Sequence, residues 1–305
     1  MYPRYLNELS TGSLTIPLLV VGTRASHVTP HRHDFLELQV ILDGHGTEYV
    51  NGKPHRLEPG SVTFLLPYQI HELHAEPGQS LHICNCNFDM SLLFDGNGPL
   101  SGLSGLLAET DVLPSHLRLH GEEKQQMDSL VHSLLREYAG EAKWKAVQLK
   151  ALLFQALVLF DRVRSESAAA AVRPVAGAAA AEQVQSQNNL WPVVHYMHEH
   201  YRDDLGLQQL ANHFHMNAKH LSALMIKRLG QNFVSFLHEL RIRHACSLLR
   251  STDLPITSIA LETGFGSFQT FSRCFAKLKG MTPSQYRRAQ TLATSSQAPG
   301  HSSQQ

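Results

Sequence analysis

The chain has 305 residues, of which 43% are hydrophobic, so it can form two or three domains with packed cores and is not a disordered chain. Its four cysteines are too few for a disulfide framework, and Cys84 and Cys86 have no second pair nearby to complete a zinc site, so we expect reduced thiols in a reducing compartment. The formal net charge is zero, but residues 190–290 carry 12 basic and 6 acidic side chains, which suggests a polyanionic partner for this part alone, with solvated surface charge as the alternative.

No segment has the pattern of a targeting or membrane-spanning sequence. The apolar stretch Leu14 to Val21 is interrupted by Pro17 and has no basic leader. The most apolar run, Ala151 to Phe160, is too short to cross a bilayer. We therefore expect a cytoplasmic protein that makes no contact with a membrane.

Residues 14–90 have the pattern of many short β-strands. Asn51-Gly52 is typical of a tight hairpin. Short strands at regular spacing favour a sandwich or a small barrel. The apolar runs and the turn signals between them are Phe35–Leu42, Val62–Leu66 and Leu81–Phe88, with Asp43-Gly44, Asn51-Gly52, Pro59-Gly60 and Pro77-Gly78.

Two amphipathic helices are predicted after the strands. Apolar side chains at helical spacing over 127–138 predict the first, and we expect the second over Ala142 to Val163. The second helix is apolar nearly all round over 151–160, so it must be buried on more than one side. We therefore expect residues 122–164 to pack on the barrel and to form a homodimer, with burial inside one chain as the alternative.

Two further segments are poor in large apolar side chains. Residues 165–189 are rich in alanine and then in Gln, Ser and Asn, which is typical of an interdomain linker. Residues 291–305 are rich in Ser and Gln, and we expect a disordered tail there.

From Leu190 onward the sequence is helical again. A short helix that starts at Leu207 carries the small residue Ala211, and a connector follows. Asn217 is a suitable N-cap for the next helix, which ends at Gly230. A small residue that lets a second helix cross closely is typical of a helix-turn-helix, whose second helix enters the major groove of DNA.

The same order recurs about fifty residues later. Pro255 favours a helix start, Ala260 is the small residue, and Gly264 ends the helix. Ser267 caps a further helix that stops before Gly280. A long helix, Phe233 to Leu249, is expected between the copies, with Arg241, Arg243 and Arg250 available to a partner.

The segment from Leu240 to Arg287 closely resembles the C-terminal signature of AraC/XylS-type transcription regulators. A lone helix-turn-helix pattern is weak, but this many fixed spacings together are specific. The resemblance covers about 190–289 and rests on Arg241-Ile242, Ala245, Leu248-Leu249, Ile256, Ile259-Ala260, Gly264-Phe265, Phe271-Ser272-Arg273, Phe275, Gly280, Pro283 and Tyr286-Arg287.

The resemblance implies that the second helix of each copy contacts DNA. The first copy departs from the family pattern, with Asn217 in place of the usual Ser, Ala223 where Arg is frequent and Met225 where Phe is usual. Gln can pair with adenine and Arg with guanine, whereas lysines position the protein on phosphates. The residues expected at DNA are Lys219, Ser222, Lys227 and Arg228 in the first copy, and Ser267, Phe268, Gln269, Ser272, Arg273 and Lys277 in the second.

A histidine-rich stretch in the β region suggests a binding site. His31, His33 and Glu37 have the same parity and would share one face of a strand. Two imidazoles and a carboxylate can ligate Zn, Fe, Mn or Ni, and His71 could complete the set. The stretch resembles the first motif of cupin barrels, while the second motif is only loosely present, because Ala75 stands in place of the usual Asn.

Regulators of this family often have a cupin-like sensor domain that binds sugars or other small effectors. The resemblance therefore implies effector binding and no cofactor. The alternatives are that these side chains satisfy one another, or that His31, His33, Glu37 and His71 hold a metal. The residues expected at the effector are Arg24, His31, His33, Glu37, Gln39, Tyr49 and His71.

The sequence as a whole predicts an α+β multidomain protein. We expect a cupin-like antiparallel barrel over 1–121 with two amphipathic helices over 122–164, a linker, and an all-α domain with two helix-turn-helix units over 190–290. Its partners would be double-stranded DNA, a sugar-like effector, a second copy of the chain and, for an activator, RNA polymerase. A metal-dependent cupin enzyme and a constitutive DNA-binding protein are the rival functions.

Overall fold

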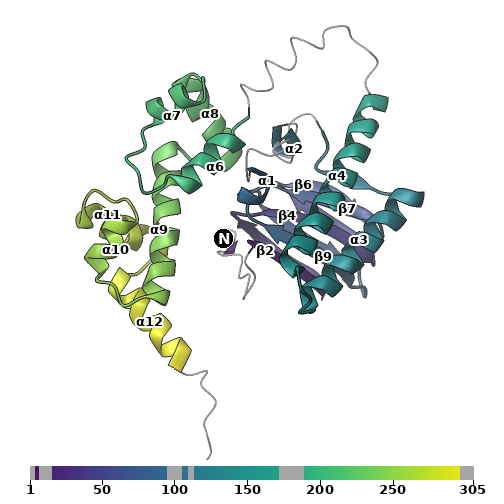
Figure 1. Ribbon diagram of the computed structural model, residues 1–305, viewed down its shortest axis with the longest axis horizontal. Coiled ribbons are helices and arrows are strands. Elements are labelled where there is room, and N and C mark those ends of the chain that lie inside the picture. The colour runs from purple at the N-terminus through teal and green to yellow at the C-terminus, as the bar shows by residue number, and fades with distance from the viewer. Residues whose placement is uncertain (1–3, 7–15, 95–104, 109–112, 172–188, 296–305) are drawn as a thin grey trace, which may run out of the picture. The chain divides into compact units, whose positions relative to one another are not determined.

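The computed structural model divides the chain into two compact units, 1–189 and 190–305 (Figure 1). None of the helices in the described part of the chain combines the length and the hydrophobicity needed to cross a bilayer. Most of the predicted linker lies outside the described residues. The described residues are 4–6, 16–94, 105–108, 113–171 and 189–295.

The first unit is built on two facing five-stranded sheets. Their strand orders are β1-β3-β8-β5-β6 and β10-β7-β4-β9-β2. All pairs are antiparallel except β1 and β3, which are parallel. The strands are β1 Arg4–Leu6, β2 Leu18–Ala25, β3 His27–His33, β4 Leu36–Asp43, β5 Gly46–Val50, β6 Lys53–Leu57, β7 Ser61–Leu65, β8 His71–Ala75, β9 Leu81–Phe88 and β10 His116–Arg118.

The predicted hairpin joins β5 and β6. Asn51 and Gly52 have φ angles of 50° and 79°, and both values lie in the left-handed region that a type I′ turn requires. Two-residue turns of this kind match the twist of the strands they join. The turn therefore fixes the register in which Glu48 lies opposite His55.

Side chains alternate between two faces along β4. Leu38 pairs with Phe64, whose ring lies 6.0 Å from the ring of Phe160 on α4, so this row faces the helices. Glu37 and Gln39 have the opposite parity and face the other sheet. The polar side chains of β4 are therefore buried between the two sheets.

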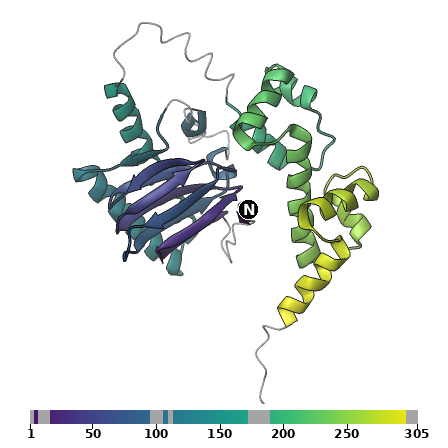
Figure 2. The same ribbon diagram turned by 180° about the vertical axis from the view of Figure 1, so that it is seen from behind.

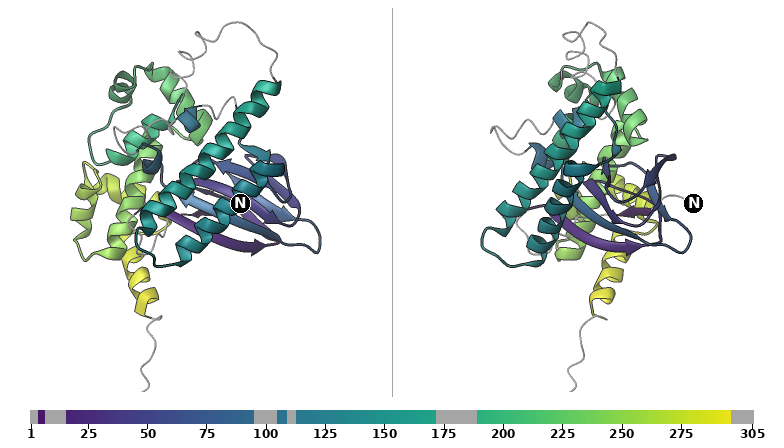
Figure 3. Two further views of the ribbon diagram at one scale, coloured as in Figure 1. Left: turned by 45° about the vertical axis from the view of Figure 1, so that its right-hand side comes forward. Right: turned by 90° about the vertical axis from the view of Figure 1, so that its right-hand side faces the viewer.

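Two helices cover the outer face of the second sheet, as Figure 3 shows. In Figure 2 the first sheet faces the viewer and these helices lie behind. They are α3 (Gly121–Ala139) and α4 (Lys145–Ala171), and the short helices α1 (Ser91–Phe94) and α2 (Gly105–Ala108) complete the unit. Helix α4 continues eight residues past the predicted end at Val163, because alanine is the best helix former.

One chain buries most of the apolar segment of α4. Between 151 and 160, only Ala151 and Gln155 are exposed. Phe160 is fully buried, and Leu159 is 9% exposed. The apolar surface that suggested a homodimer is thus largely covered within the chain itself, which is the alternative left open by the sequence.

Over its described residues, 190–295, the second unit contains helices and no strand, and it shows the predicted duplication. A short helix and a longer one form each copy, α7 with α8 and α10 with α11, and the long helix α9 lies between the copies. The helices are α6 Trp191–Glu199, α7 Leu207–His213, α8 Ala218–Leu229, α9 Phe233–Ser251, α10 Ile256–Glu262, α11 Phe268–Lys279 and α12 Pro283–Ser295. The last helix extends into the predicted tail.

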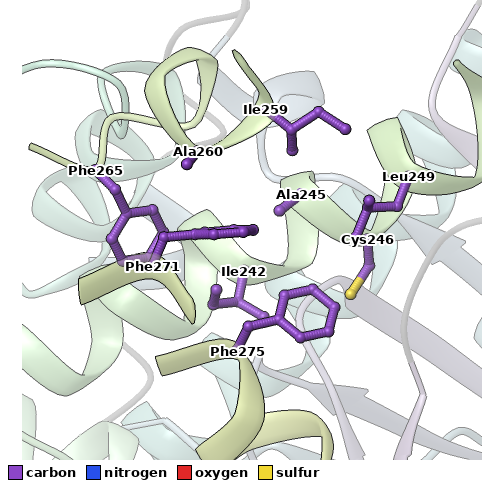
Figure 4. Close-up of a cluster of buried hydrophobic side chains, with 9 residues drawn as sticks. All are labelled: Ile242, Ala245, Cys246, Leu249, Ile259, Ala260, Phe265, Phe271 and Phe275. Atoms are coloured by element: carbon purple, nitrogen blue, oxygen red, sulfur yellow. The ribbon is translucent and has the colours of Figure 1, made fainter. Parts of the chain in front are cut away.

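Helix α9 supplies one wall of the core around the second copy. Phe271 and Phe275 of α11 are fully buried, and their rings lie 5.7 Å apart. Figure 4 shows them in one cluster with buried side chains of α9 and α10. This core fixes α11 by its apolar face, so the opposite face is left to solvent. The cluster comprises Ile242, Ala245, Cys246, Leu249, Ile259, Ala260, Phe265, Phe271 and Phe275.

Candidate nucleic-acid interface and interior polar cluster

Each copy of the helix-turn-helix is fixed by the same local interactions. Ala211 and Ala260 are buried where the two helices cross. The side chain of Asn217 accepts the backbone N–H of Lys219 at 2.9 Å, and Ser267 Oγ accepts that of Thr270 at 3.2 Å. These are N-caps, which satisfy backbone donors that the first helical turn leaves unpaired.

Both second helices end in the same way. Gly230 and Gly280 each have a φ of 70°, the left-handed conformation that ends a helix at little cost when the residue is glycine. The copies are offset by fifty residues over this part, so each position of α8 has a counterpart on α11. The duplication inferred from the sequence is confirmed at the level of caps, turns and helix ends.

The solvent face of α11 carries the polar residues predicted to meet DNA. Gln269, Arg273 and Lys277 are exposed at four-residue spacing, which places them along one face, and Ser272 beside them is half-buried. Phe268 is 41% exposed at the start of the helix. Ser267 instead caps the helix, so its hydroxyl is already engaged.

The solvent face of α8 is less rich in hydrogen-bonding groups. Lys219 and Lys227 are exposed, and Ser222 between them is half-buried. Arg228 is half-buried, and burial lowers its pKa. Lys219 and Lys227 correspond to Gln269 and Lys277, so the two helices present lysine at one equivalent position.

Arg241 is not available to a partner, contrary to the expectation from the sequence. Its side chain is 8% exposed. Its Nε donates to the carbonyl of Tyr201 at 2.7 Å, and its terminal nitrogen donates to that of Asp203 at 2.8 Å. The guanidinium also lies 5.8 Å from the ring centroid of Phe265. Arg241 therefore joins α9, the segment before α7 and the turn of the second copy.

In the first unit, the buried polar residues gather between the two sheets. The expectation that His31, His33 and Glu37 share a strand was wrong, because β3 ends at His33 and Glu37 lies on β4 of the other sheet. The two sheets face each other, so His33 Nε2 still lies 3.3 Å from Glu37 Oε2.

A second pair of a histidine and a carboxylate lies beside the first. His71 Nδ1 is 3.5 Å from Glu48 Oε1, and Thr63 donates a hydrogen bond of 2.7 Å to Glu48 Oε2. Thr63 also lies 3.0 Å from His116 Nδ1. Sequence reasoning missed this chain of contacts from His71 through Glu48 and Thr63 to His116. Glu48 and Val50 are two residues apart in a strand bounded by turn signals, so their side chains share one face of the sheet. The apolar Val50 was therefore the available signal that Glu48 faces inward.

Three amides complete the buried set, which we call the interior polar cluster. Gln39, Asn85 and Asn87 have side-chain atoms that are fully buried and have no hydrogen-bond partner among the described residues. The strand register pairs Gln39 with Asn85 and Glu37 with Asn87. The cluster comprises His31, His33, Glu37, Gln39, Glu48, Thr63, His71, Asn85 and Asn87.

The interior of the barrel is polar at one end and apolar at the other. Along β4 the inward side chains change from Glu37 and Gln39 to Ile41, and along β9 they change from Asn87 and Asn85 to Ile83. The apolar end is a packed core of Ile41, Leu57, Leu73, Leu81 and Ile83. A ligand would therefore meet hydrogen-bonding groups at the polar end only.

Two residues predicted at the effector lie outside this cluster. Arg24 is exposed on β2. Tyr49 is the neighbour of Glu48 on β5 and points to the opposite face, where its ring lies 5.8 Å from that of His74. The remaining five predicted residues, His31, His33, Glu37, Gln39 and His71, are brought together.

The electrostatics of the cluster favour an ionised carboxylate. Burial raises the pKa of Glu37, but His33, together with the nearby His71 and His31, outweighs it, and the net pKa lies below its ordinary value. Burial and the neighbouring His71 lower the pKa of His31 to about 4, so His31 is neutral at pH 7. Burial lowers the pKa of His71, but Glu48 and Glu37 together more than reverse this and raise it.

Comparison with known proteins assigns both units. A family model described as an AraC-like ligand binding domain matches residues 18–157, and one described as a helix-turn-helix domain matches residues 210–289. The HTH-type transcriptional activator RhaS of Citrobacter koseri is 26% identical over 260 residues, which cover 84% of this chain and 86% of that protein. RhaS of Klebsiella pneumoniae is 25% identical over 259 residues, with the same coverage.

A solved structure is similar over most of the chain. ToxT from Vibrio cholerae is 14% identical, covers 89% of this chain and 98% of its own, and has a TM-score of 0.47. The two matched domains together span most of the sequence. The chain therefore belongs to the AraC family and is a DNA-binding transcription regulator with a ligand-binding N-terminal domain, not an enzyme.

Proposed function

We propose that this regulator binds a sugar or a related carbohydrate in the interior polar cluster, and that binding changes how the two helix-turn-helix units engage DNA. The observation that carries the proposal is the set of buried polar atoms on Gln39, Asn85 and Asn87 that have no hydrogen-bond partner in the part of the chain that the structure describes. Leaving such atoms unpaired is costly, and a polyhydroxylated ligand offers each of them a donor or an acceptor.

A thermal-shift screen of the full chain tests the effector. We expect a stabilising sugar from a panel of mono- and disaccharides and sugar acids, worth about 2.7 kcal/mol at a hundredfold excess over Kd. The shift should disappear in Gln39→Leu, which removes two buried polar atoms. Arg24→Ala is the matched control, because Arg24 is exposed and lies outside the cluster.

Two results would count against this effector site. A panel without any stabilising sugar would remove the carbohydrate assignment. A stabilising sugar whose effect is lost in Arg24→Ala and kept in Gln39→Leu would place the ligand on the outer surface of the barrel.

We propose that α11 reads base edges. Gln269 and Arg273 would form hydrogen bonds with adenine and guanine, with Phe268 and Ser272 in the same groove, while Lys219, Lys227, Arg228 and Lys277 contact phosphates. The support is their placement on the solvent faces of α8 and α11. On this proposal, Ser267 contributes by capping the start of α11 and not by contacting a base. Ser222 lies beside the lysines that bind phosphate.

Replacing Arg273 by alanine should weaken specific DNA binding by about 1–3 kcal/mol and relax the preference at one base pair. Lys277→Ala is the control for a phosphate contact and should weaken binding to all sequences alike. It should also reduce the slope of log K against log salt by about one. Titrations of specific and random duplexes at several salt concentrations measure both effects. An equal loss on both duplexes in Arg273→Ala would show that this residue contacts phosphate alone.

We further propose that the protein acts as a homodimeric activator in the cytoplasm and contacts RNA polymerase. The support is its DNA partner together with its similarity to activators. Trp144 and Val147, which are 69% and 62% exposed, provide an apolar surface near the start of α4. Sedimentation of the full chain tests the dimer, and Val147→Asp should shift it toward monomer. A monomer at micromolar concentration in the unsubstituted protein would overturn this proposal.

A further inference from the structure

Helices α8 and α11, which we call the two reading helices, can be compared position by position. Both have 12 residues, both follow an N-cap, and both end at a glycine with a φ of 70°. The inward positions are also shared, since Leu221 and Met225 are buried on α8 and Phe271 and Phe275 are buried on α11, fifty residues later. The solvent faces are therefore equivalent, and any difference between them changes what each helix offers to DNA.

The two solvent faces differ in where they carry a large side chain. On α8 the small residue Ala223 comes first and the large residue Ile226 follows three residues later, and both are exposed. On α11 the order is reversed, with Arg273 at the first position and Ala276 at the second, and both are again exposed. The position that holds a guanidinium on α11 thus holds a methyl group on α8.

The side chain of Ile226 extends this apolar surface. Helical side chains lean toward the N-terminus of their helix, over the residues three and four positions before them. The side chain of Ile226, which is 55% exposed, is therefore directed over the turn that contains Ala223. The two side chains form one apolar patch on α8, at the place where α11 presents the donors of Arg273.

Two lysines flank the apolar patch. Lys219 lies four residues before Ala223 and Lys227 lies four residues after it, and both are exposed. At four-residue spacing these three side chains share one face of the helix. Lysines suit the phosphates along the edges of the major groove, so the patch between them faces the base edges when both lysines are bound.

We infer that α8 recognises thymine, through contact of Ala223 and Ile226 with the thymine methyl group. This methyl is the apolar group that base edges present in the major groove, and alanine is among the residues suited to contact it. The contact favours thymine over cytosine, which has a hydrogen atom at the same ring position. The inference rests on the proposed position of α8 at DNA, and it names the base that this helix reads.

The comparison also makes position 223, like its counterpart 273, the one that determines specificity in its helix. Arg273 suits guanine because a guanidinium can donate two hydrogen bonds to O6 and N7. The double substitution Ala223→Arg with Ile226→Ala gives α8 the two residues that α11 has. Selection of binding sites from a random duplex library should then yield guanine in place of thymine at one position that α8 reads. A selected site without this change would contradict the equivalence of the two positions.

Single replacements of thymine by deoxyuridine test the methyl contact directly, because they remove only the methyl group. The probe is a duplex that the unsubstituted full chain selects from the random library. Arg273→Ala identifies the part of this duplex that α11 reads, and the remaining selected positions form the α8 half-site. There we expect about a fourfold loss of affinity at one or two thymines, and a loss of about twofold or less in Ile226→Ala.

Leu261→Ala is the matched control for Ile226→Ala. Leu261 lies on α10 and is 67% exposed, so it is an exposed apolar residue of the same unit outside the reading helices. This variant should keep the full sensitivity to the thymine methyl group. Both substitutions are made at exposed positions, and far-UV circular dichroism checks that each variant is folded.

Two outcomes would overturn the inference. One is the same methyl effect in Ile226→Ala as in the unsubstituted protein, and the other is an α8 half-site in which no deoxyuridine replacement lowers the affinity. The proposed position of α8 is tested separately by Lys219→Ala and Lys227→Ala, which should weaken binding to all sequences. If they do so while the methyl effect is absent, thymine recognition alone is wrong. If neither lysine matters, α8 does not contact DNA as proposed.

Discussion

Replacing Arg241 by methionine is expected to destabilise the DNA-binding unit by about 3–5 kcal/mol. Methionine keeps much of the apolar stem but removes both donors, so the carbonyls of Tyr201 and Asp203 lose their charged partners. A hydrogen bond to a charged group contributes about 1.5–3 kcal/mol, and a buried acceptor without a partner adds its desolvation cost. The loss is large against a typical domain stability of about 5–15 kcal/mol.

Tryptophan fluorescence can report this unit alone. The chain has two tryptophans, and Trp191 lies in α6 at 4% exposure, so a Trp144→Phe background leaves one buried reporter. We expect the denaturation midpoint of Arg241→Met to fall sharply, and that of the exposed control Arg288→Met to stay close to the unsubstituted value. Arg241→Lys should recover only part of the loss, because an ammonium lacks the planar fork. Equal midpoints for Arg241→Met and Arg288→Met would contradict the proposal that Arg241 stabilises the unit by joining α9 to the segment before α7.

The double helix-turn-helix could be predicted because its signals are local. Asn217, Ser267, Gly230 and Gly280 determine where helices begin and end through interactions within a few residues. Apolar spacing then identifies the buried face of α11. The hairpin at Asn51-Gly52 is local in the same sense. Such features depend little on the rest of the fold.

The interior polar cluster could be predicted only in part, because it forms between sheets. Parity along the chain selected His33 and Glu37 but assigned them to one strand. Which polar side chains face inward on distant strands depends on register, so Glu48, Asn85 and Asn87 were not identified. The apolar surface of α4 likewise indicated burial without showing that its own chain covers it.

Arg241 and Gly264 show a further limit of sequence reasoning. The sequence suggested a solvent-accessible role for the arginine and a helix-ending role for the glycine. In the structure both meet the same backbone segment, Tyr201 to Asp203, which leads into the first helix-turn-helix. This junction joins the two copies, and contacts between segments about forty residues apart for Arg241 and about sixty for Gly264 leave no local trace in the sequence.

Gly264→Ala should therefore lower the free energy of unfolding by about 2–5 kcal/mol, more than the same change at any comparable glycine of this unit. Gly264 has a φ of 84°, where a side chain costs about 1–2 kcal/mol. An added Cβ would also lie 2.7 Å from the carbonyl oxygen of Arg202 and 2.9 Å from its Cα. The backbone of one copy must move, and overpacking of this kind adds about 1–3 kcal/mol.

Gly280→Ala is the matched control, because its φ is 70° and an added Cβ meets nothing within 4 Å. It should cost only the conformational part, about 1–2 kcal/mol. The first copy supports this separation of a conformational cost from a contact cost. There, His215 occupies the position equivalent to Gly264 with a φ of 51°, so a side chain is tolerated at this backbone conformation. Denaturation followed through Trp191 compares the two variants. Equal losses of unfolding free energy in the two variants would mean that backbone conformation alone requires glycine at 264. A larger loss in Gly264→Ala, together with weaker binding to a duplex with two half-sites, would show that close contact at this junction sets the spacing of the two reading helices.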